Sequence, residues 1–275
     1  MTKTNLFQGS LEVKSDWWKS EGGFFGKKYA EADNSLEGFL KNPQVMNARV
    51  TQEVSGVIKL CNLKKGDKIL DAPCGYGRHS LGLALRGFGV TGVDINKEHL
   101  GIGRKSLKKL KLVNADFYRR DIRKLNFKNK YDAVINMFYS FGFFDDFIDD
   151  MKTLENFYRV LRKGGKFLMH TFITLPKIEN GDYKKRDIRT LVTGNKLELF
   201  REYDYKTKRE FGEWSLVTKN GKKHKLAPYS MRIYTDIEYI GMCTKVGFSK
   251  IDVYGGWKGE KYKDSSELMI VVATK

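Results

Sequence analysis

Apolar and polar positions along the chain repeat with two different periods. The first clear helical pattern places Val50, Val54 and Val57 on one face and ends in a turn at residues 64–67. A short apolar run at residues 68–71 then predicts a buried strand. Runs of this kind alternate with helical patterns further along. The expected strands are 89–93, 112–118, 131–137 and 166–173, and the expected helices are 78–86, 96–110 and 145–161.

The pattern changes after Pro176, where alternating apolar and polar residues replace the helical spacing. Asn220-Gly221 is a hairpin signal, so this stretch predicts an antiparallel insertion. Its expected strands are 197–205, 210–218 and 225–234. A helix and two strands are expected to return to the main sheet, at 235–246, 249–254 and 267–273.

Strands that alternate with helices predict a parallel, doubly wound sheet. The expected fold is therefore α/β, a Rossmann-like, seven-stranded, mostly parallel sheet with helices on both faces and an antiparallel β lid. Four parts follow along the chain: an N-terminal aromatic helical cap at 1–45, the Rossmann-like core at 46–175, the lid at 176–234, and a C-terminal helix with the last two core strands at 235–275.

Composition excludes several classes of protein. Of the 275 residues, 41% are hydrophobic and 13% aromatic, which is too rich for a disordered chain. The 4 prolines and 27 glycines have no fixed period, so a collagen-like chain is excluded as well. Cys61, Cys74 and Cys243 have no disulfide or zinc spacing, and no apolar run is long enough for a membrane helix or a signal core. We expect a cytoplasmic protein that does not enter a membrane.

The chain is strongly basic, with 51 lysines and arginines against 33 acids, a net charge of +18. The basic residues cluster at 104–130, at Lys184, Lys185, Arg186 and Arg189, and at Lys222, Lys223 and Lys225. Such a surface attracts nucleic acids and other polyanions, but a lysine-rich composition alone produces the same charge. The charge therefore leaves a polyanionic partner open.

Residues 69–78 carry the main chemical signal, because a strand ends in an acid, a glycine-rich loop follows, and a helix begins. Glycines allow close approach of the backbone to a ligand, and the helix start presents free N–H groups. The phosphate-loop lysine is absent, and Ser80 replaces the third glycine of the dinucleotide fingerprint. Asp94 lies 94 − 71 = 23 residues after Asp71, at the end of the next strand, where an acid can accept both ribose hydroxyls.

Together these motifs resemble the class I S-adenosylmethionine-dependent methyltransferases, in particular a type 11/25-like bacterial and archaeal subgroup. The resemblance includes Asp71 to Gly77, the ribose acid Asp94 and the acid Asp121 after the third strand. It extends to the fourth strand with the run 136–144 and to the Leu-Arg-Lys-Gly-Gly turn at 161–165. In this family the fold binds S-adenosylmethionine and releases S-adenosylhomocysteine. The residues implied to bind it are Asp71, Ala72, Gly75, Gly77, Arg78, Asp94, Ile95, Asp121, Ile122, Asn136, Met137 and Tyr29.

Methyl transfer from a sulfonium requires alignment and exclusion of water, and a base only if the acceptor is protonated. His170 and Tyr139 are the candidate catalytic residues, since both lie near carboxyl ends of strands. Each is also compatible with a packing role. The candidate substrate-binding residues are Tyr139, Ser140, Tyr229, Arg232 and Tyr234. The four histidines have no metal-ligand spacing, so no metal is expected.

The sequence favours methylation of a small molecule on N, O or C. If this acceptor is anionic, Arg232 could pair with it. The Asn/Asp-Pro-Pro-Tyr tetrapeptide of many amino methyltransferases is replaced by Asn136-Met137-Phe138-Tyr139, which argues against methylation of an exocyclic base nitrogen. Two alternatives stay open: an RNA methyltransferase that uses the basic surface, and a non-catalytic S-adenosylmethionine-binding protein. The chain is expected to be a monomer or a homodimer.

Overall fold

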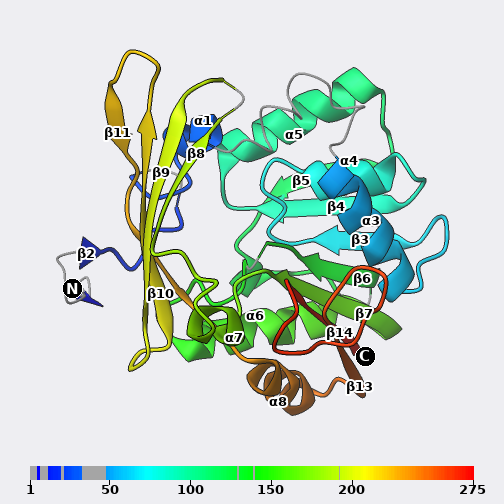
Figure 1. Ribbon diagram of the computed structural model, residues 1–275. Helices are drawn as coiled ribbons and strands as arrows, with labels where there is room; N and C mark the ends of the chain where they lie inside the picture. Colours follow the sequence, from blue (N-terminus) through cyan, green and yellow to red (C-terminus); the bar gives the residue numbers. More distant parts are fainter. Residues whose placement is uncertain are drawn as a thin grey trace.

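The computed structural model describes residues 5–6, 12–19, 22–32, 48–128, 130–138, 140–191 and 193–275. The two larger β-sheets stand next to each other, with α1 (Lys27–Ala32) between them on one side (Figure 1). The larger sheet and its helices form the core, and the smaller antiparallel sheet forms the lid.

The core sheet has seven strands in the order β13-β14-β7-β6-β3-β4-β5. β14 is antiparallel to both neighbours, and β3, β4, β5, β6 and β7 run parallel. The bounds are β3 Lys68–Asp71, β4 Gly89–Asp94, β5 Ala115–Arg119, β6 Tyr131–Asn136, β7 Leu161–Thr171, β13 Lys250–Tyr254 and β14 Met269–Thr274. The predicted doubly wound, mostly parallel α/β sheet of seven strands is therefore confirmed.

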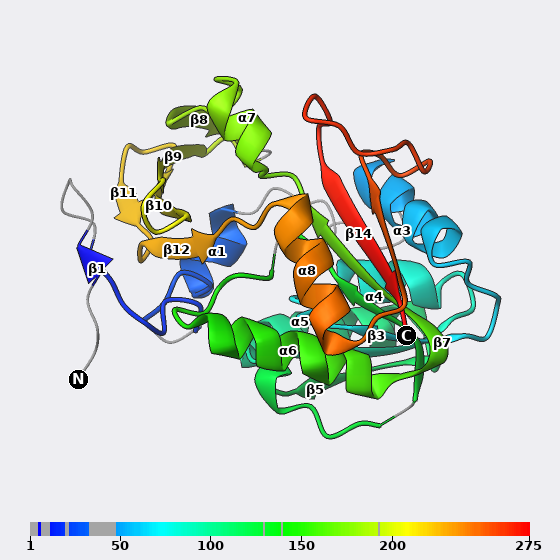
Figure 2. The ribbon, with the colours of Figure 1, turned by 90° about the horizontal axis from the view of Figure 1, so that it is seen from below.

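Helices cover both faces of this sheet, because successive strand residues point to opposite sides. Ile69 packs on the side of α3 (Ala48–Leu60), α4 (Arg78–Ala84) and α5 (Lys97–Leu110). Its neighbour Leu70 packs on the side of α6 (Phe147–Val160) and α8 (Asp236–Val246). Figure 2 shows α6 and α8 together on this second face. The short 3-10 helix η1 (Ile122–Lys124) follows β5.

The lid is inserted between β7 and α8. Its strand order is β11-β10-β9-β8, and β12 pairs with β10 next to β11. The bounds are α7 Leu175–Glu179, β8 Arg186–Thr190, β9 Lys196–Asp204, β10 Arg209–Val217, β11 Lys223–Lys225 and β12 Tyr229–Arg232. The sequence predicted an antiparallel insertion here, but neither α7 nor β8 was expected, and the third predicted strand is divided into β11 and β12.

The N-terminal segment forms β1 (Asn5–Leu6) and β2 (Glu12–Val13) on the side of the lid away from the core, and it then passes to α1 between the lid and the core (Figure 1). Trp17 and Phe24 are buried there, with ring centroids 5.8 and 4.9 Å from the ring of Tyr229 in β12. These aromatic contacts fix the segment against the lid, next to the carboxyl ends of the core strands.

Candidate functional site

The glycine-rich loop after β3 approaches its neighbours very closely. Gly77 has φ +85°, and a Cβ there would lie 2.3 Å from Cζ of Phe117, so a side chain would clash. The backbone N–H of Gly75 donates to Oδ2 of Asp94 at 2.8 Å, and the N–H of Asn96 donates to Oδ1 at 2.8 Å. The loop and the end of β4 are thus held together through one carboxylate.

Asp94 and Asp71 are both buried, but they face different surroundings. Asp94 lines a cavity, and burial raises the pKa of its carboxyl, against the lowering by its backbone hydrogen bonds. Asp71 lies beneath the loop, away from the cavity lining, and Oδ2 accepts a 2.6 Å hydrogen bond from Ser80. Burial raises the pKa of Asp71 to about 7, although the Ser80 hydrogen bond opposes this shift. Asp94 is therefore placed to meet a ligand, and Asp71 to support the loop.

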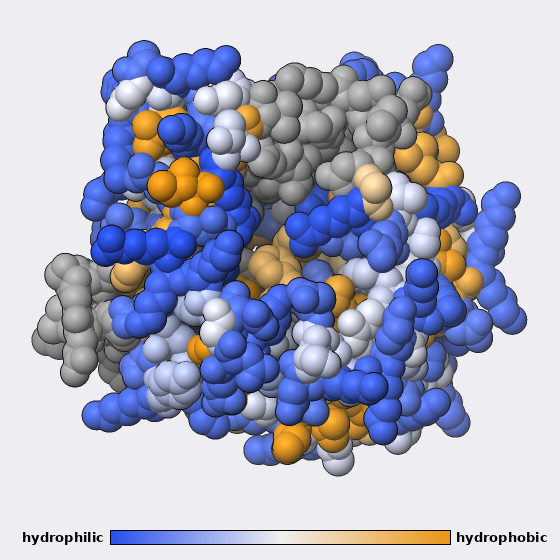
Figure 3. All heavy atoms as spheres, in the orientation of Figure 1, coloured by the Kyte–Doolittle hydropathy of each residue, from blue (hydrophilic) through white to orange (hydrophobic). Residues whose placement is uncertain are grey.

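The cavity has a volume of about 410 Å³ and lies between the carboxyl ends of the core strands and the lid. Figure 3 shows a recess between these two parts, with apolar side chains inside it. Ten of the predicted site residues line the cavity: Tyr29, Gly75, Arg78, Asp94, Ile95, Asp121, Ile122, Met137, Ser140 and Tyr229. Residues predicted from the core, the N-terminal segment and the lid thus come together.

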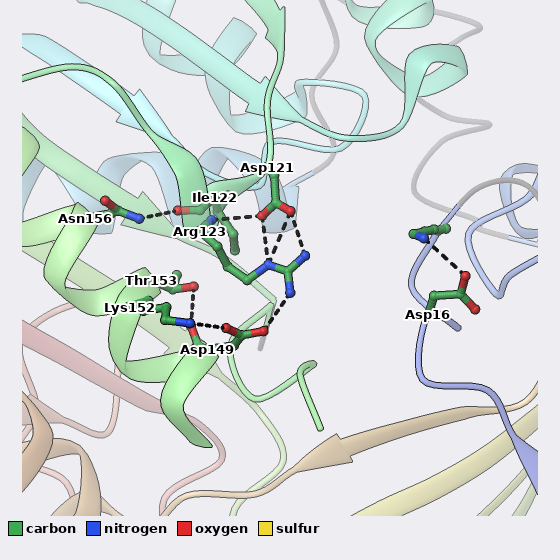
Figure 4. Close-up of polar contacts among 9 residues, drawn as sticks. Asp16, Asp121, Ile122, Arg123, Asp149, Lys152, Thr153 and Asn156 are labelled. Atoms are coloured by element: carbon green, nitrogen blue, oxygen red, sulfur yellow. Dashed lines mark hydrogen bonds and ion pairs between the residues drawn. The ribbon is translucent and has the colours of Figure 1, made fainter. Parts of the chain in front are cut away.

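One end of the cavity is braced by ion pairs around Asp121 (Figure 4). Arg123 donates from Nη2 to Oδ2 of Asp121 at 2.7 Å and from Nη1 to Oδ2 of Asp149 at 2.7 Å. Burial opposes ionisation of Asp121, but the Arg123 hydrogen bonds and charge lower its pKa overall. The guanidinium also lies 4.5 Å from the ring centroid of Phe144, which lines the cavity. This network joins η1 to α6 and fixes the acid.

Two arginines lie against one aromatic ring of the cavity wall. Cζ of Arg78 lies 3.7 Å and Cζ of Arg49 lies 4.4 Å from the ring centroid of Phe138. Arg49 also pairs with Glu53 at 2.9 Å, whereas no carboxylate of the described residues lies within 4.0 Å of Arg78. Phe138 has φ +61°, which directs its ring into this position after β6. Arg78 is thus a buried cation, held by an aromatic face, at the start of α4.

His170 lies outside the cavity lining and is 1% exposed. Its ring centroid is 4.9 Å from that of Trp257, and Nδ1 accepts a 3.4 Å contact from the N–H of Phe138. Burial lowers the pKa of His170 to about 3. This placement does not support the predicted role of general base and supports packing beneath Phe138.

Other predicted residues are also away from the cavity lining. Ala72, Gly77 and Asn136 support it from behind, since Nδ2 of Asn136 donates to the carbonyl of Ala72 at 2.9 Å. Tyr234 is buried and donates to Oδ2 of Asp150 at 2.7 Å. Arg232 contacts the carbonyl of Thr207 and the Tyr234 ring at a surface groove. The structure therefore does not place Arg232 and Tyr234 where they were predicted to bind substrate, and Tyr139 lies outside the described residues.

Most of the lid residues that line the cavity were not predicted from the sequence. The lining residues from this part of the chain, besides Tyr229, are Arg189, Leu191, Leu197, Leu199, Arg201 and Trp214. The period-2 alternation of β9 could have shown that residues 197, 199 and 201 share a face, but not that this face looks inward. Among the described residues, no group of three or more His, Cys, Asp or Glu side chains could hold a metal ion, and no helix has the length and apolar character to cross a membrane.

A sequence model of the family described as "Methyltransferase domain" matches residues 63–221. The chain belongs to this family. It is a class I S-adenosylmethionine-dependent methyltransferase, as its sequence motifs predicted, and S-adenosylmethionine is its cofactor. The family model ends within the lid.

Curated relatives agree with this assignment. "Putative methyltransferase YqeM" of Bacillus subtilis is 31% identical over 108 residues, which cover 39% of this chain and 43% of that protein. "Ubiquinone/menaquinone biosynthesis C-methyltransferase UbiE" of Klebsiella pneumoniae is 29% identical over 213 residues, 75% of this chain and 73% of that protein.

Solved structures show the same fold. An S-adenosylmethionine-dependent methyltransferase from Clostridium acetobutylicum superposes with a TM-score of 0.71 at 16% identity, covering 90% of this chain and 97% of that one. CalS10 from Micromonospora echinaspora, an amino pentose methyltransferase with S-adenosylmethionine bound, has a TM-score of 0.63 at 16% identity. The superposition covers 86% of this chain and 95% of that one.

Proposed function

We propose that this methyltransferase acts on a small molecule. The observation that carries the proposal is that Asp94, Arg78 and the inner face of the lid all line one cavity of about 410 Å³. A site of that size, closed on one side by an inserted sheet, fits a small acceptor better than a polymer. UbiE acts in ubiquinone and menaquinone biosynthesis, which agrees with a small acceptor.

The side chains fit S-adenosylmethionine at three points. Asp94 presents a buried carboxylate at the carboxyl end of β4, suited to the ribose hydroxyls. Asp121 lies at the braced end, suited to the adenine, as the family resemblance implies. Arg78 is a buried cation without a carboxylate partner among the described residues, suited to the carboxylate of the methionine part.

The cofactor supplies an activated methyl group, and the chain's own task is alignment. Phe138, which lies against Arg49 and Arg78, gives that part of the cavity a fixed aromatic wall. Ser140 and Met137 line it after β6, and Tyr29 closes it from the N-terminal segment, stacked on Trp214 at 5.6 Å. These residues hold the reacting groups in line and exclude water.

Calorimetric titration with S-adenosylmethionine tests the cofactor placement. Asp94→Asn should weaken binding about ten- to hundredfold, because a hydrogen bond to a charged group contributes roughly 1.5–3 kcal/mol. Asp116→Asn, on the exposed side of neighbouring β5, is the matched control and should bind as wild type does. Equal affinity of the Asp94 variant would contradict the placement. Formation of S-adenosylhomocysteine with a low-molecular-weight extract tests the acceptor class.

A further inference from the structure

The inner face of the lid presents arginines to the cavity. In the register of the sheet, Arg201 of β9 lies opposite Gly212 of β10, and Leu199 lies opposite Trp214. Arg189 of β8 lies opposite Leu197 of β9. Because strand residues two apart share a face, the cavity-lining residues Arg189, Leu197, Leu199, Arg201 and Trp214 form one surface, which we name the inner lid face.

The guanidinium of Arg201 is oriented by neutral groups. Its Nε donates to the carbonyl of Lys184 at 2.9 Å, and its Cζ lies 4.8 Å from the ring centroid of Tyr183. Among the described residues no carboxylate lies within 4.0 Å of it, and its two Nη atoms have no hydrogen-bond acceptor. One hydrogen bond and one ring contact orient the guanidinium, and they leave its two Nη atoms available to a ligand.

Arg189 on the neighbouring strand differs from Arg201, because it forms an ion pair with a carboxylate. Its Nε donates to Oδ2 of Asp187 at 2.8 Å, and its side chain is 51% exposed. Its Nη atoms have no acceptor in the part of the chain that the structure describes. Asp187 orients the Arg189 side chain through Nε alone, so the two Nη atoms of Arg189 are available to a ligand.

The charges of the cavity are divided between its two sides. The acids among its described lining residues are Asp94 and Asp121, and both belong to the core. Glu210 also belongs to the lid's inward side, but it is fully buried outside the lining and accepts a 2.6 Å hydrogen bond from Tyr229. Burial raises the pKa of Glu210, which disfavours its charged form, although the Tyr229 hydrogen bond and the charge of Arg201 oppose this shift. Asp187 lies opposite Leu199 on the inner lid face and pairs with Arg189, so Arg201 gives this otherwise apolar face its excess positive charge.

We infer that the methyl acceptor carries an oxyanion, a carboxylate or a phosphate, which Arg189 and Arg201 bind from the lid. Arginine forks match both groups through paired N–H donors. The apolar part of the acceptor lies against Leu197, Leu199 and Trp214, between the oxyanion and the methyl group. This inference rests on the proposed small-molecule methyltransferase activity and names the class of its acceptor.

The test labels a low-molecular-weight cell extract with methyl-tritiated S-adenosylmethionine and the full-length protein. Labelled products are separated by ion exchange at neutral pH, and retention on the anion exchanger is expected. Arg201→Gln and Arg189→Gln should each lower the rate of labelling at limiting extract about tenfold or more. Arg201→Lys should fall between them and wild type, because it keeps the charge without the fork.

Arg186→Gln is the matched control, because Arg186 is on β8 but alternates to the outer side, with its Cζ 5.9 Å from the ring of Phe200. It should label as wild type does, and all four variants should bind S-adenosylmethionine normally. Digestion of the product with phosphodiesterase and alkaline phosphatase separates the two oxyanions, since only a phosphate would lose its retention.

Products that are neutral or cationic overturn the inference and leave the proposed function intact. The same holds if the Gln variants at 189 and 201 label as fast as Arg186→Gln. Absence of any labelled product from protein that binds S-adenosylmethionine would contradict the small-molecule acceptor itself, and the inference with it.

Discussion

Two carboxyl groups in the same loop region show how position decides the behaviour of a residue. Asp71 and Asp94 end adjacent parallel strands, and both are almost fully buried. Asp94 accepts backbone N–H groups from Gly75 and Asn96 at the cavity, whereas Asp71 is hydrogen-bonded by Ser80 alone and its Oδ1 has no partner in the described residues. An under-satisfied, buried carboxyl favours its neutral form.

Asp71→Asn should therefore gain stability relative to wild type as the pH rises. The folded pKa of Asp71 is about 7, against 3.8 when unfolded, so the folded state keeps a proton that the unfolded state loses. Between these two pKa values the free energy of unfolding of the wild type falls by about 1.4 kcal/mol per pH unit. The variant lacks this titrating group, so its free energy of unfolding does not fall for this reason. Urea unfolding of both proteins at about pH 5 and pH 7 measures the difference. A difference that does not change with pH would refute the shifted titration.

Arg123→Gln should weaken S-adenosylmethionine binding about three- to tenfold, because part-exposed ion pairs contribute about 1 kcal/mol. The variant frees Asp121 from Arg123 and removes the tie to Asp149. Lys124→Gln, an exposed change in the same 3-10 helix, is the control. Turnover at saturating cofactor should remain normal, and a loss of turnover with unchanged affinity would argue that the network acts on the acceptor side.

Single residues were predictable where the backbone alone fixes them. Asp94 and Gly75 could be placed from the strand ends and loop spacing, and both line the cavity. His170 and Arg232 depended on which way a side chain turns, and neither lines it. For Arg232 the reason is a backbone hydrogen bond, because its N–H donates to the carbonyl of Gly142 at 2.8 Å and holds β12 against the core. The Arg232 side chain then lies at the outer groove.

At the scale of the elements, local patterns predicted the succession of core strands and helices along the chain, but they did not predict all the elements of the lid. The structure ends α6 at Val160 and begins β7 at Leu161, so the Lys163-Gly164-Gly165 turn lies inside a long strand and not before it. β8 was missed because its burial pattern is mostly exposed, without an apolar run to mark it. Lid strands are selected by cross-strand pairing, which a single stretch of sequence does not contain.

The lid depends on a close approach at its centre. The Tyr229 ring lies across Gly212, where a Cβ would be 2.3 Å from the ring Cζ, and its hydroxyl reaches Glu210. Gly212→Ala should displace this ring, lower stability by about 1–3 kcal/mol, and slow turnover while cofactor affinity is kept. Gly241→Ala on α8, with no atom within 4 Å of the new methyl group, is the control. Thermal melts and titration measure both, and unchanged melting of the Gly212 variant would refute the close packing.

At the scale of the whole molecule, the core acids Asp94 and Asp121 and the lid arginines line one cavity although they are distant in sequence. Asp94 belongs to the matched methyltransferase domain, and so do Arg189 and Arg201, since the family match runs over residues 63–221. The net charge of +18 is spread much more widely, over many exposed lysines. A surface charge and a charged cavity act on different partners, because only a small group can enter the cavity.

RNA should therefore bind the surface but receive no methyl group. Exposed lysines attract phosphates without a sequence code, so the affinity should fall steeply with salt, with counterion release giving a slope of about −0.7 per phosphate contacted on single strands. Total cellular RNA incubated with tritiated S-adenosylmethionine should carry no ribonuclease-sensitive label, while the low-molecular-weight fraction of the same extract is labelled. Ribonuclease-sensitive label would instead assign the chain to RNA methylation.

In that case an RNA nucleotide would have to pass the lid and enter the roughly 410 Å³ cavity beside the cofactor. The arginines of the inner lid face would then contact the RNA phosphates. Arg201→Gln would in that case lower RNA labelling at low and high salt alike, whereas surface binding without methylation would respond to salt and not to this variant.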